Sequence, residues 1–297
     1  MRRFSGARLT AAGSVVACLL AVTAAIPASA TSTSNSDPTN NSNPNNYLAL
    51  GDSVPFGFNP LLATQPGVAP TSFVGYPQLA SDLFRPRLKV VNASCPGETS
   101  TSLISGTRPD NGCQNFRQAI GAMHVSYQGS QLQYAEKYVA ANRRTKLVSL
   151  MIGANDLFRL QDACVTTGGD VNACILKGLT TSLVPTLRAN LTTIYTGLRE
   201  AGFRGELVAV TYYSTNYADP VVTAAVLGLN AVLAGVTKAY GGEVADGFGA
   251  FARAAGPRGD PCAAGLLIHV SPTTCDVHPS PTGAALLASA LSAAAER

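Results

Sequence analysis

Short runs of apolar and β-branched residues alternate along this chain with longer segments whose apolar residues recur every three or four positions. The short runs predict buried strands, of which the last is the weakest: residues 48–50, 88–91, 147–152, 207–211 and 242–245. The longer segments predict helices with one apolar face: residues 131–144, 183–200, 221–240 and 281–296. Strands that alternate with helices predict one α/β sandwich built on a parallel sheet.

The first thirty residues have a different pattern from the rest of the chain. Arg2, Arg3 and Arg8 lead into an apolar run over residues 9–26, and Ala28-Ser29-Ala30 matches the small-x-small site that signal peptidase cleaves. We therefore expect residues 1–30 to be a signal peptide, cleaved near Ala30, and the mature protein to be secreted. A lipoprotein cleavage box ending at Cys18 is the alternative, but apolar residues continue after it.

Residues 31–46 contain no apolar side chain that a core would bury, which predicts a disordered linker. The folded domain is expected over residues 47–297. No later stretch looks both long and uninterrupted enough to span a bilayer. Residues 221–236 come nearest, and their Gly228 and Asn230 favour a helix packed on the surface of the domain.

The net charge of the mature chain limits the kinds of partner that it could bind. Loss of the three N-terminal arginines lowers Lys+Arg from 21 to 18, against 17 acidic residues, which leaves a formal net charge of +1. No basic stripe remains for nucleic acid. We expect a monomer without a stable membrane anchor, whose partner is a small-molecule or lipid substrate.

Six cysteines remain after Cys18 is removed with the signal peptide. An even number in an exported chain indicates three disulfides. Pairing each cysteine with its nearest neighbour closes three short polar loops, and this is the pairing that we expect: Cys95–Cys113, Cys164–Cys174 and Cys262–Cys275.

Three of the predicted strands run directly into a distinctive loop. These loops are Gly51-Asp52-Ser53, residues 92–98 around Gly97, and Gly153-Ala154-Asn155-Asp156. In parallel sheets, ligands and chemistry gather at the carboxyl ends of the strands. The sequence therefore predicts a site at this edge of the sheet.

Each of these residues has an ordinary explanation when it is taken alone. Ser53 and Asn155 could cap helices, Gly97 could serve a tight turn, and His278 could be exposed. Taken together they match an acyl-transfer site. A serine hydroxyl needs a base such as His278, and the tetrahedral intermediate needs donors such as the N–H groups of Ser53 and Gly97 and the Asn155 amide.

The blocks Gly51-Asp52-Ser53, Gly97, Gly153-x-Asn155-Asp156 and Asp276-x-His278 follow the order of the four blocks of SGNH (GDSL-type) hydrolases. The stretches "ALGDSVPFGF", "NASCPGETS" and "MIGANDLF" resemble those of secreted bacterial esterases and lipases of that family, and the resemblance spans residues 47–297. It implies a flavodoxin-like three-layer α/β/α sandwich. It also implies that Ser53 is the nucleophile, His278 the base, and Ser53, Gly97 and Asn155 the oxyanion hole.

Two positions depart from the family pattern. Val54 stands where the GDSL name has leucine, and Cys275 stands where the family has its aspartate, three residues before the histidine. Asp276 is only two residues before His278. We expect Asp276 to orient His278; the alternative acceptor is a backbone carbonyl near Thr273 or Thr274.

Other chemistries find little support in the sequence. The chain has no G-x-S-x-G elbow, no H-E-x-x-H and no Gly-Lys pair. We expect no metal and no cofactor, and structural roles for His124 and His269.

The resulting prediction is a secreted serine esterase or lipase that acts on lipid or simple acyl esters. Its acyl group would lie near Pro55, Phe56, Leu157 and Phe158; the alternative role for these four residues is packing in the core. A carbohydrate acetyl-esterase, and a non-catalytic exported binding module on the same scaffold, are the alternatives. The absence of tryptophan favours lipid or simple esters over sugars.

Overall fold

The computed structural model describes residues 45–296, with β1 beginning at Asn46. The described fold thus starts one residue before the expected domain, and Asn46 belongs to a strand rather than to a linker. The expected signal peptide and residues 31–44 of the expected linker lie outside the described residues.

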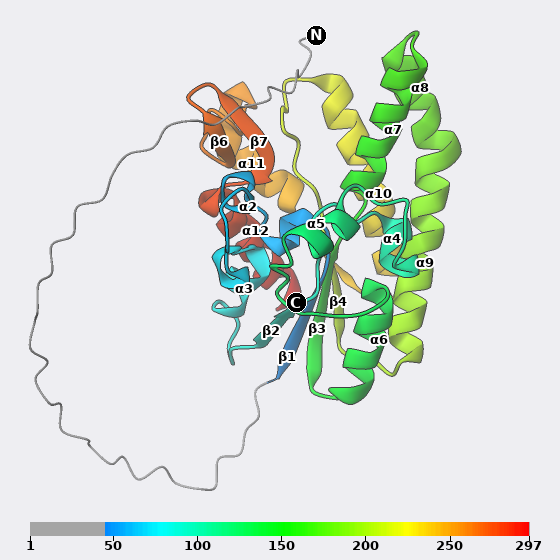
Figure 1. The fold of residues 1–297 in the computed structure, drawn as a ribbon, viewed down its shortest axis with the longest axis vertical. Coiled ribbons are helices and arrows are strands. Elements are labelled where there is room, and N and C mark those ends of the chain that lie inside the picture. Colours follow the sequence, from blue (N-terminus) through cyan, green and yellow to red (C-terminus); the bar gives the residue numbers. More distant parts are fainter. Residues whose placement is uncertain (1–44, 297) are drawn as a thin grey trace, which may run out of the picture. The chain divides into compact units, whose positions relative to one another are not determined.

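A five-stranded parallel sheet forms the centre of the fold, with the strand order β2-β1-β3-β4-β5 (Figure 1). All five predicted strands are present, each within two residues of its predicted bounds: β1 (Asn46–Gly51), β2 (Lys89–Asn92), β3 (Thr145–Met151), β4 (Glu206–Val210) and β5 (Glu243–Ala245). The inner strands are buried along almost their whole length, as expected for a parallel sheet covered on both faces.

Helices cover both faces of the sheet (Figure 1). One face carries α3 (Tyr76–Ser81) and α12 (Pro281–Ala295), which pack against each other. The other face carries α6 (Gln131–Ala141), α9 (Val184–Glu200) and α10 (Pro220–Ala239). The four predicted helices are therefore all present, and the sandwich has the flavodoxin-like strand order.

Neither α3 nor the remaining elements were predicted. The remaining elements comprise seven further α-helices, a π-helical turn, two 3₁₀ turns and an antiparallel hairpin: α1 (Ser53–Phe56), α2 (Pro60–Ala63), α4 (Ser100–Ser105), α5 (Cys113–Ala119), α7 (Ala154–Thr167), α8 (Val171–Gly178), α11 (Gly247–Ala255), the π turn Leu179–Leu183, the 3₁₀ turns Pro70–Ser72 and Gly256–Arg258, and the hairpin of β6 (Leu267–Ser271) and β7 (Thr274–Pro279).

Among the helices of residues 45–296, α10 alone is long and apolar enough to cross a membrane, judged by length and composition only. The expectation that no stretch would pass such a test was therefore wrong. In the fold, however, α10 packs against β4, β5 and α9, and Asn230 is buried on it. The Asn230 amide accepts a hydrogen bond from the Tyr212 N–H at 2.8 Å and donates one to the Tyr212 carbonyl at 2.7 Å.

The three disulfides follow nearest-neighbour pairing, with Cα–Cα separations of 5.6–5.7 Å. Cys95–Cys113 ties the loop after β2 to the first turn of α5, and Cys262–Cys275 ties β7 to the segment before β6. Cys164–Cys174 joins the end of α7 to α8, whereas Asn155 lies at the other end of α7.

Removing the α7–α8 bridge tests this assignment. We expect Cys164→Ser with Cys174→Ser to lower the free energy of unfolding by about 2–4 kcal/mol, because the open chain gains conformational freedom. Urea titration followed by circular dichroism measures the change, with Ser289→Ala, an exposed substitution on α12, as the control. An unchanged urea midpoint, or a non-reducing peptide map with different pairs, would contradict the assignment.

Candidate active site

The turn after β1 requires glycine at its first position. Gly51 has φ +134°, and a Cβ there would lie 2.0 Å from the Met151 carbonyl oxygen of the neighbouring strand. Asp52 then caps α1, since its Oδ1 accepts the Val54 N–H at 3.0 Å. This close packing places Ser53 at the first position of α1, on the carboxyl edge of the sheet.

His278 reaches Ser53 from β7, at the far end of the chain. Its Nε2 lies 2.8 Å from Ser53 Oγ. Its Nδ1 is hydrogen-bonded to Asp276 Oδ1, and the same carboxylate oxygen accepts the His278 backbone N–H at 3.0 Å. The acceptor at Nδ1 is thus the Asp276 carboxylate and not a carbonyl near Thr273 or Thr274.

The two-residue spacing works because β7 is extended at this point. Asp276 bonds both the backbone and the ring of His278, which fixes the ring orientation. Burial alone would raise the pKa of Asp276, but the hydrogen bonds from His278 and the electrostatic attraction between the two groups outweigh it and lower the pKa below its usual value. A carboxylate that stays ionised at Nδ1 keeps Nε2 free to accept a proton from Ser53.

Three residues that line one cavity each have an N–H group without a partner among residues 45–296. The backbone N–H groups of Ser53 and Gly97 donate to no other described atom, and the Asn155 Nδ2 has one N–H to spare. The other N–H of that amide donates to the Glu98 carbonyl at 3.0 Å, while Asn155 Oδ1 accepts from Asn111 Nδ2 at 2.8 Å. Both contacts fix the amide with its free N–H available to a ligand.

Gly97 is required for this arrangement. It has φ +82°, and a Cβ would lie 2.4 Å from the Asn111 carbonyl oxygen. Its own carbonyl accepts the Asn111 N–H at 2.7 Å, so the loop after β2 lies tightly against the segment before α5. The Gly97 N–H is thereby held at the wall of the cavity.

The cavity has a volume of about 540 Å³ and holds Ser53, Gly97, Asn155 and His278 in its wall. Most of its other lining is apolar, and α7 and α10 contribute a large part of it, including Leu157, Phe158, Val222, Ala225, Val226 and Leu229. Two of the four residues expected near an acyl group, Leu157 and Phe158, therefore line the cavity. Pro55 and Phe56 are not part of the lining, because Phe56 packs with Phe73 and Phe116 in a separate core cluster.

Sequence reasoning missed the partner of Asp52. The Tyr212 hydroxyl donates to Asp52 Oδ2, and both side chains are fully buried. Burial raises the pKa of Asp52 to about 6, while the bonds from Tyr212 and Val54 act in the opposite direction. Tyr212 lies two residues beyond the end of β4, so the sequence placed it near the site's edge of the sheet but gave no sign of its partner.

The other motif aspartate, Asp156, is structural. It accepts the Ser100 N–H at 2.9 Å and the Ser100 hydroxyl at 2.7 Å, which ties α7 to the start of α4. Burial raises the pKa of Asp156. His124 is also structural: its ring nitrogen bonds the Phe56 carbonyl at 2.9 Å.

Two clusters among the described residues have the side chains of a metal site, Cys262-His269-Cys275 and Cys95-Glu98-Cys113. In each, both cysteines are joined in a disulfide, so neither offers a thiolate.

The model of the GDSL-like Lipase/Acylhydrolase family matches residues 49–286. A search of curated proteins finds no match.

Several solved structures share the fold. The extracellular lipase from Streptomyces rimosus is 19% identical over 84% of this chain and 99% of that chain, with a TM-score of 0.52. The phospholipase A1 from Streptomyces albidoflavus is 18% identical (85% and 100%; TM-score 0.52), and an acetylxylan esterase from Geobacillus stearothermophilus is 20% identical (83% and 92%; TM-score 0.51).

The carboxylate at Nδ1 leads to a testable expectation. Asp276→Ala should lower kcat for ester hydrolysis by about 10³–10⁴, because the imidazole loses the group that fixes its tautomer. Asp170→Ala is the control, since it removes the N-cap of α8 far from His278 and should cost about 1 kcal/mol of stability with no loss of kcat. A folded Asp276→Ala enzyme that loses less than about tenfold in kcat would show that Asp276 does not orient the histidine.

Proposed function

Because the chain belongs to the GDSL-like lipase/acylhydrolase family, we propose that it hydrolyses carboxylic esters of aliphatic acyl groups through an acyl-enzyme on Ser53. One observation carries this proposal: Ser53 Oγ lies 2.8 Å from His278 Nε2 in the wall of a cavity that is mostly apolar. Carboxylic-ester hydrolysis is the activity of the family, and the contact between Ser53 and His278 supports the proposal that these side chains perform it here.

The proposed reaction has two halves. Ser53 Oγ attacks the ester carbonyl carbon while His278 Nε2 takes the hydroxyl proton. The carbonyl oxygen becomes an oxyanion, and the N–H groups of Ser53, Gly97 and Asn155 would stabilise it. When the intermediate collapses, the C–O bond to the alcohol breaks and His278 donates its proton to the leaving oxygen.

Water completes the second half by the same steps. His278 takes a proton from water as the water oxygen attacks the acyl carbon. The second intermediate then releases the acid and returns the proton to Ser53 Oγ. Asp276 remains ionised throughout and stabilises the imidazolium that forms in each half.

The shape of the cavity supports an acyl group longer than acetyl. An acetyl group has two carbons, whereas the cavity has about 540 Å³ and a wall of Leu, Val, Phe and Ala side chains from α7 and α10. Burying each methylene against such a wall stabilises the complex by about 0.8 kcal/mol. The acyl chain would therefore lie between α7 and α10, with its carbonyl at Ser53.

Export is part of the proposal. Three disulfides hold this domain, and disulfides persist in oxidising compartments. The expected signal peptide over residues 1–30 gives the same location. We infer that the mature enzyme works outside the cytoplasm, without a metal or cofactor, on esters that it meets there.

The role of Ser53 has a direct test. Ser53→Ala should fold normally and lose kcat on p-nitrophenyl butyrate by about 10⁴-fold or more, since no other group forms the acyl-enzyme. Ser94→Ala, a buried serine on the neighbouring loop, is the matched control and should keep most of its activity. A folded Ser53→Ala enzyme with a tenth or more of the wild-type turnover would exclude Ser53 as the nucleophile.

A chain-length series tests the acyl site. We expect kcat/KM for p-nitrophenyl esters to rise from acetate to esters of roughly six to ten carbons, by about tenfold per two methylenes at first. Ala225→Phe should reverse this preference by filling the cavity, whereas Ala224→Phe, on the exposed side of the same helix, should not. Ala225→Val is the milder variant should phenylalanine disturb folding. Highest activity on acetate and acetylated xylan would favour a carbohydrate acetyl-esterase, and no turnover of any ester would favour a binding module.

A further inference from the structure

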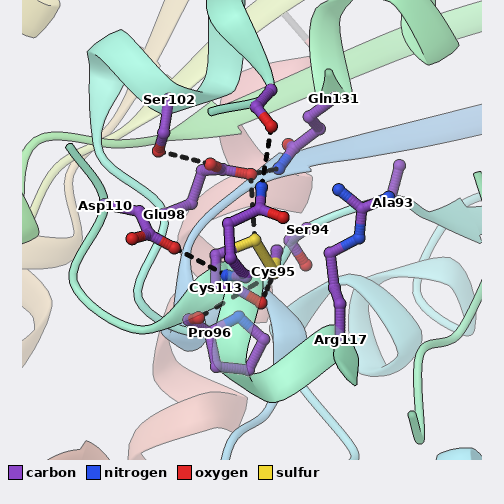
Figure 2. Close-up of a disulfide and its surroundings, with 12 residues drawn as sticks. Ala93, Ser94, Cys95, Pro96, Glu98, Ser102, Asp110, Cys113, Arg117 and Gln131 are labelled. Atoms are coloured by element: carbon purple, nitrogen blue, oxygen red, sulfur yellow. Dashed lines mark hydrogen bonds between the residues drawn. A yellow bond between two sulfur atoms is a disulfide. The ribbon is translucent and has the colours of Figure 1, made fainter. Parts of the chain in front are cut away.

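Two buried polar side chains, Glu98 and Gln131, lie behind the proposed site and are not part of the cavity wall. Each is no more than 2% exposed. Figure 2 shows Glu98 between Ser102 and Gln131, close to the Cys95–Cys113 disulfide. The proposed chemistry uses neither side chain, although burying a carboxyl group in a core is costly unless it has partners.

Gln131 is hydrogen-bonded to the end of β1, the strand that precedes Ser53. It is the first residue of α6, and its Oε1 accepts the Gly51 N–H at 2.6 Å while its Nε2 donates to the Gly51 carbonyl at 3.0 Å. Its second Nε2 hydrogen goes to Glu98 Oε2 at 3.1 Å. Every polar atom of the Gln131 amide is therefore hydrogen-bonded, and the amide joins Gly51 to Glu98.

Glu98 extends the connection to the third oxyanion donor. Its Oε1 accepts the Ser102 hydroxyl at 2.5 Å, and its backbone carbonyl accepts Asn155 Nδ2 at 3.0 Å. Burial raises the pKa of Glu98 to about 7, and the bonds from Ser102 and Gln131 partly offset that rise. The position of the Glu98 carbonyl decides where the free N–H of Asn155 lies.

We propose that Glu98 and Gln131 are positioning residues that set the distance from the Ser53 turn to the oxyanion donors Gly97 and Asn155. The Gln131 amide fixes Gly51, the Glu98 side chain anchors the loop after β2 to that amide, and the Glu98 carbonyl orients the Asn155 amide. This inference rests on the proposed hydrolase chemistry of Ser53.

The proposed positioning role predicts a change in kcat without a change in KM. The oxyanion exists only in the transition state and intermediates, so a loosened hole lowers kcat and leaves KM nearly unchanged. The Gly97 loop is also held by the Asn111 hydrogen bond, whereas the Asn155 amide depends on the Glu98 carbonyl. The loss of the Glu98 side chain should therefore matter little once the Asn155 amide is gone. A double-mutant cycle measures that dependence directly.

The experiment compares the wild type with Glu98→Ala, Asn155→Ala and the double variant in kcat and KM for p-nitrophenyl butyrate. We expect Asn155→Ala to lower kcat by about 10²–10³ and Glu98→Ala by about 10–100-fold, with KM within about threefold. In the Asn155→Ala background, Glu98→Ala should cost less than about threefold. Glu98→Gln should restore kcat to within about threefold, because its amide can still accept from Gln131 and bond Ser102.

Tyr195→Phe is the matched control. It removes a buried hydrogen bond of 2.8 Å to Thr237, between α9 and α10, and it should lower stability while its effect on kcat stays small and independent of Asn155. Should Glu98→Ala fail to fold, Ser102→Ala removes one bond to the Glu98 carboxylate, together with the bonds of Ser102 to Thr99 at the start of α4. It should lower kcat by about three- to tenfold, again only when Asn155 is present.

The inference is wrong if Glu98→Ala and Asn155→Ala lower kcat independently, so that their losses multiply in the double variant. It is also wrong if Glu98→Ala only raises KM, or if Glu98→Gln is as slow as Glu98→Ala. These outcomes differ from failure of the proposed function. If Ser53→Ala is inactive and the coupling is absent, only the positioning role fails; if Ser53→Ala remains active, the hydrolase chemistry of Ser53 fails with it.

Discussion

The parallel pairing of β1 with its two neighbours is the constraint on which the site depends. Ala49 pairs with Asn92 of β2 and Gly51 with Met151 of β3, so all three strands end at one edge of the sheet. A one-residue slip would move the Ser53 turn by about 3.3 Å along the strand and turn its side chains to the other face. Gly51 allows no such freedom, because its Cα packs directly against the Met151 carbonyl.

At this edge of the sheet, local contacts position the groups of the proposed active site. The Asp52 cap starts α1 and sets the direction of Ser53, and the close approach of Gly97 to Asn111 brings a backbone N–H to the same cavity. His278 arrives from the hairpin of β6 and β7, which lies outside the sheet, and α1 contacts β7. The proposed nucleophile and base are 225 residues apart in the chain, and the fold alone makes them neighbours.

Much of this arrangement could be predicted from the sequence, because the strands and long helices have apolar patterns set by the layers that bury them. Ser53, Gly97 and Asn155 lie in the segments that follow three of the predicted strands, so their shared edge could also be inferred. The hairpin could not: β7 has no fully buried residue, so it lacks an alternating pattern. Gln131 and Tyr212 gave no local sign of their partners, since they bond residues 80 and 160 positions away. Phe56 was misplaced because an apolar side chain next to a site can equally serve a separate core cluster.

The central claim is that Ser53 attacks an ester whose carbonyl oxygen is then held by the N–H groups of Gly97 and Asn155. A crystal structure of the mature protein after reaction with an alkyl phosphonate ester tests it most directly, since the adduct mimics the tetrahedral intermediate. The account predicts phosphorus bonded to Ser53 Oγ, one phosphonyl oxygen within about 3.1 Å of Gly97 N and Asn155 Nδ2, and the alkyl chain between α7 and α10. An adduct on another residue, or an adduct on Ser53 whose phosphonyl oxygen contacts neither donor, would contradict it.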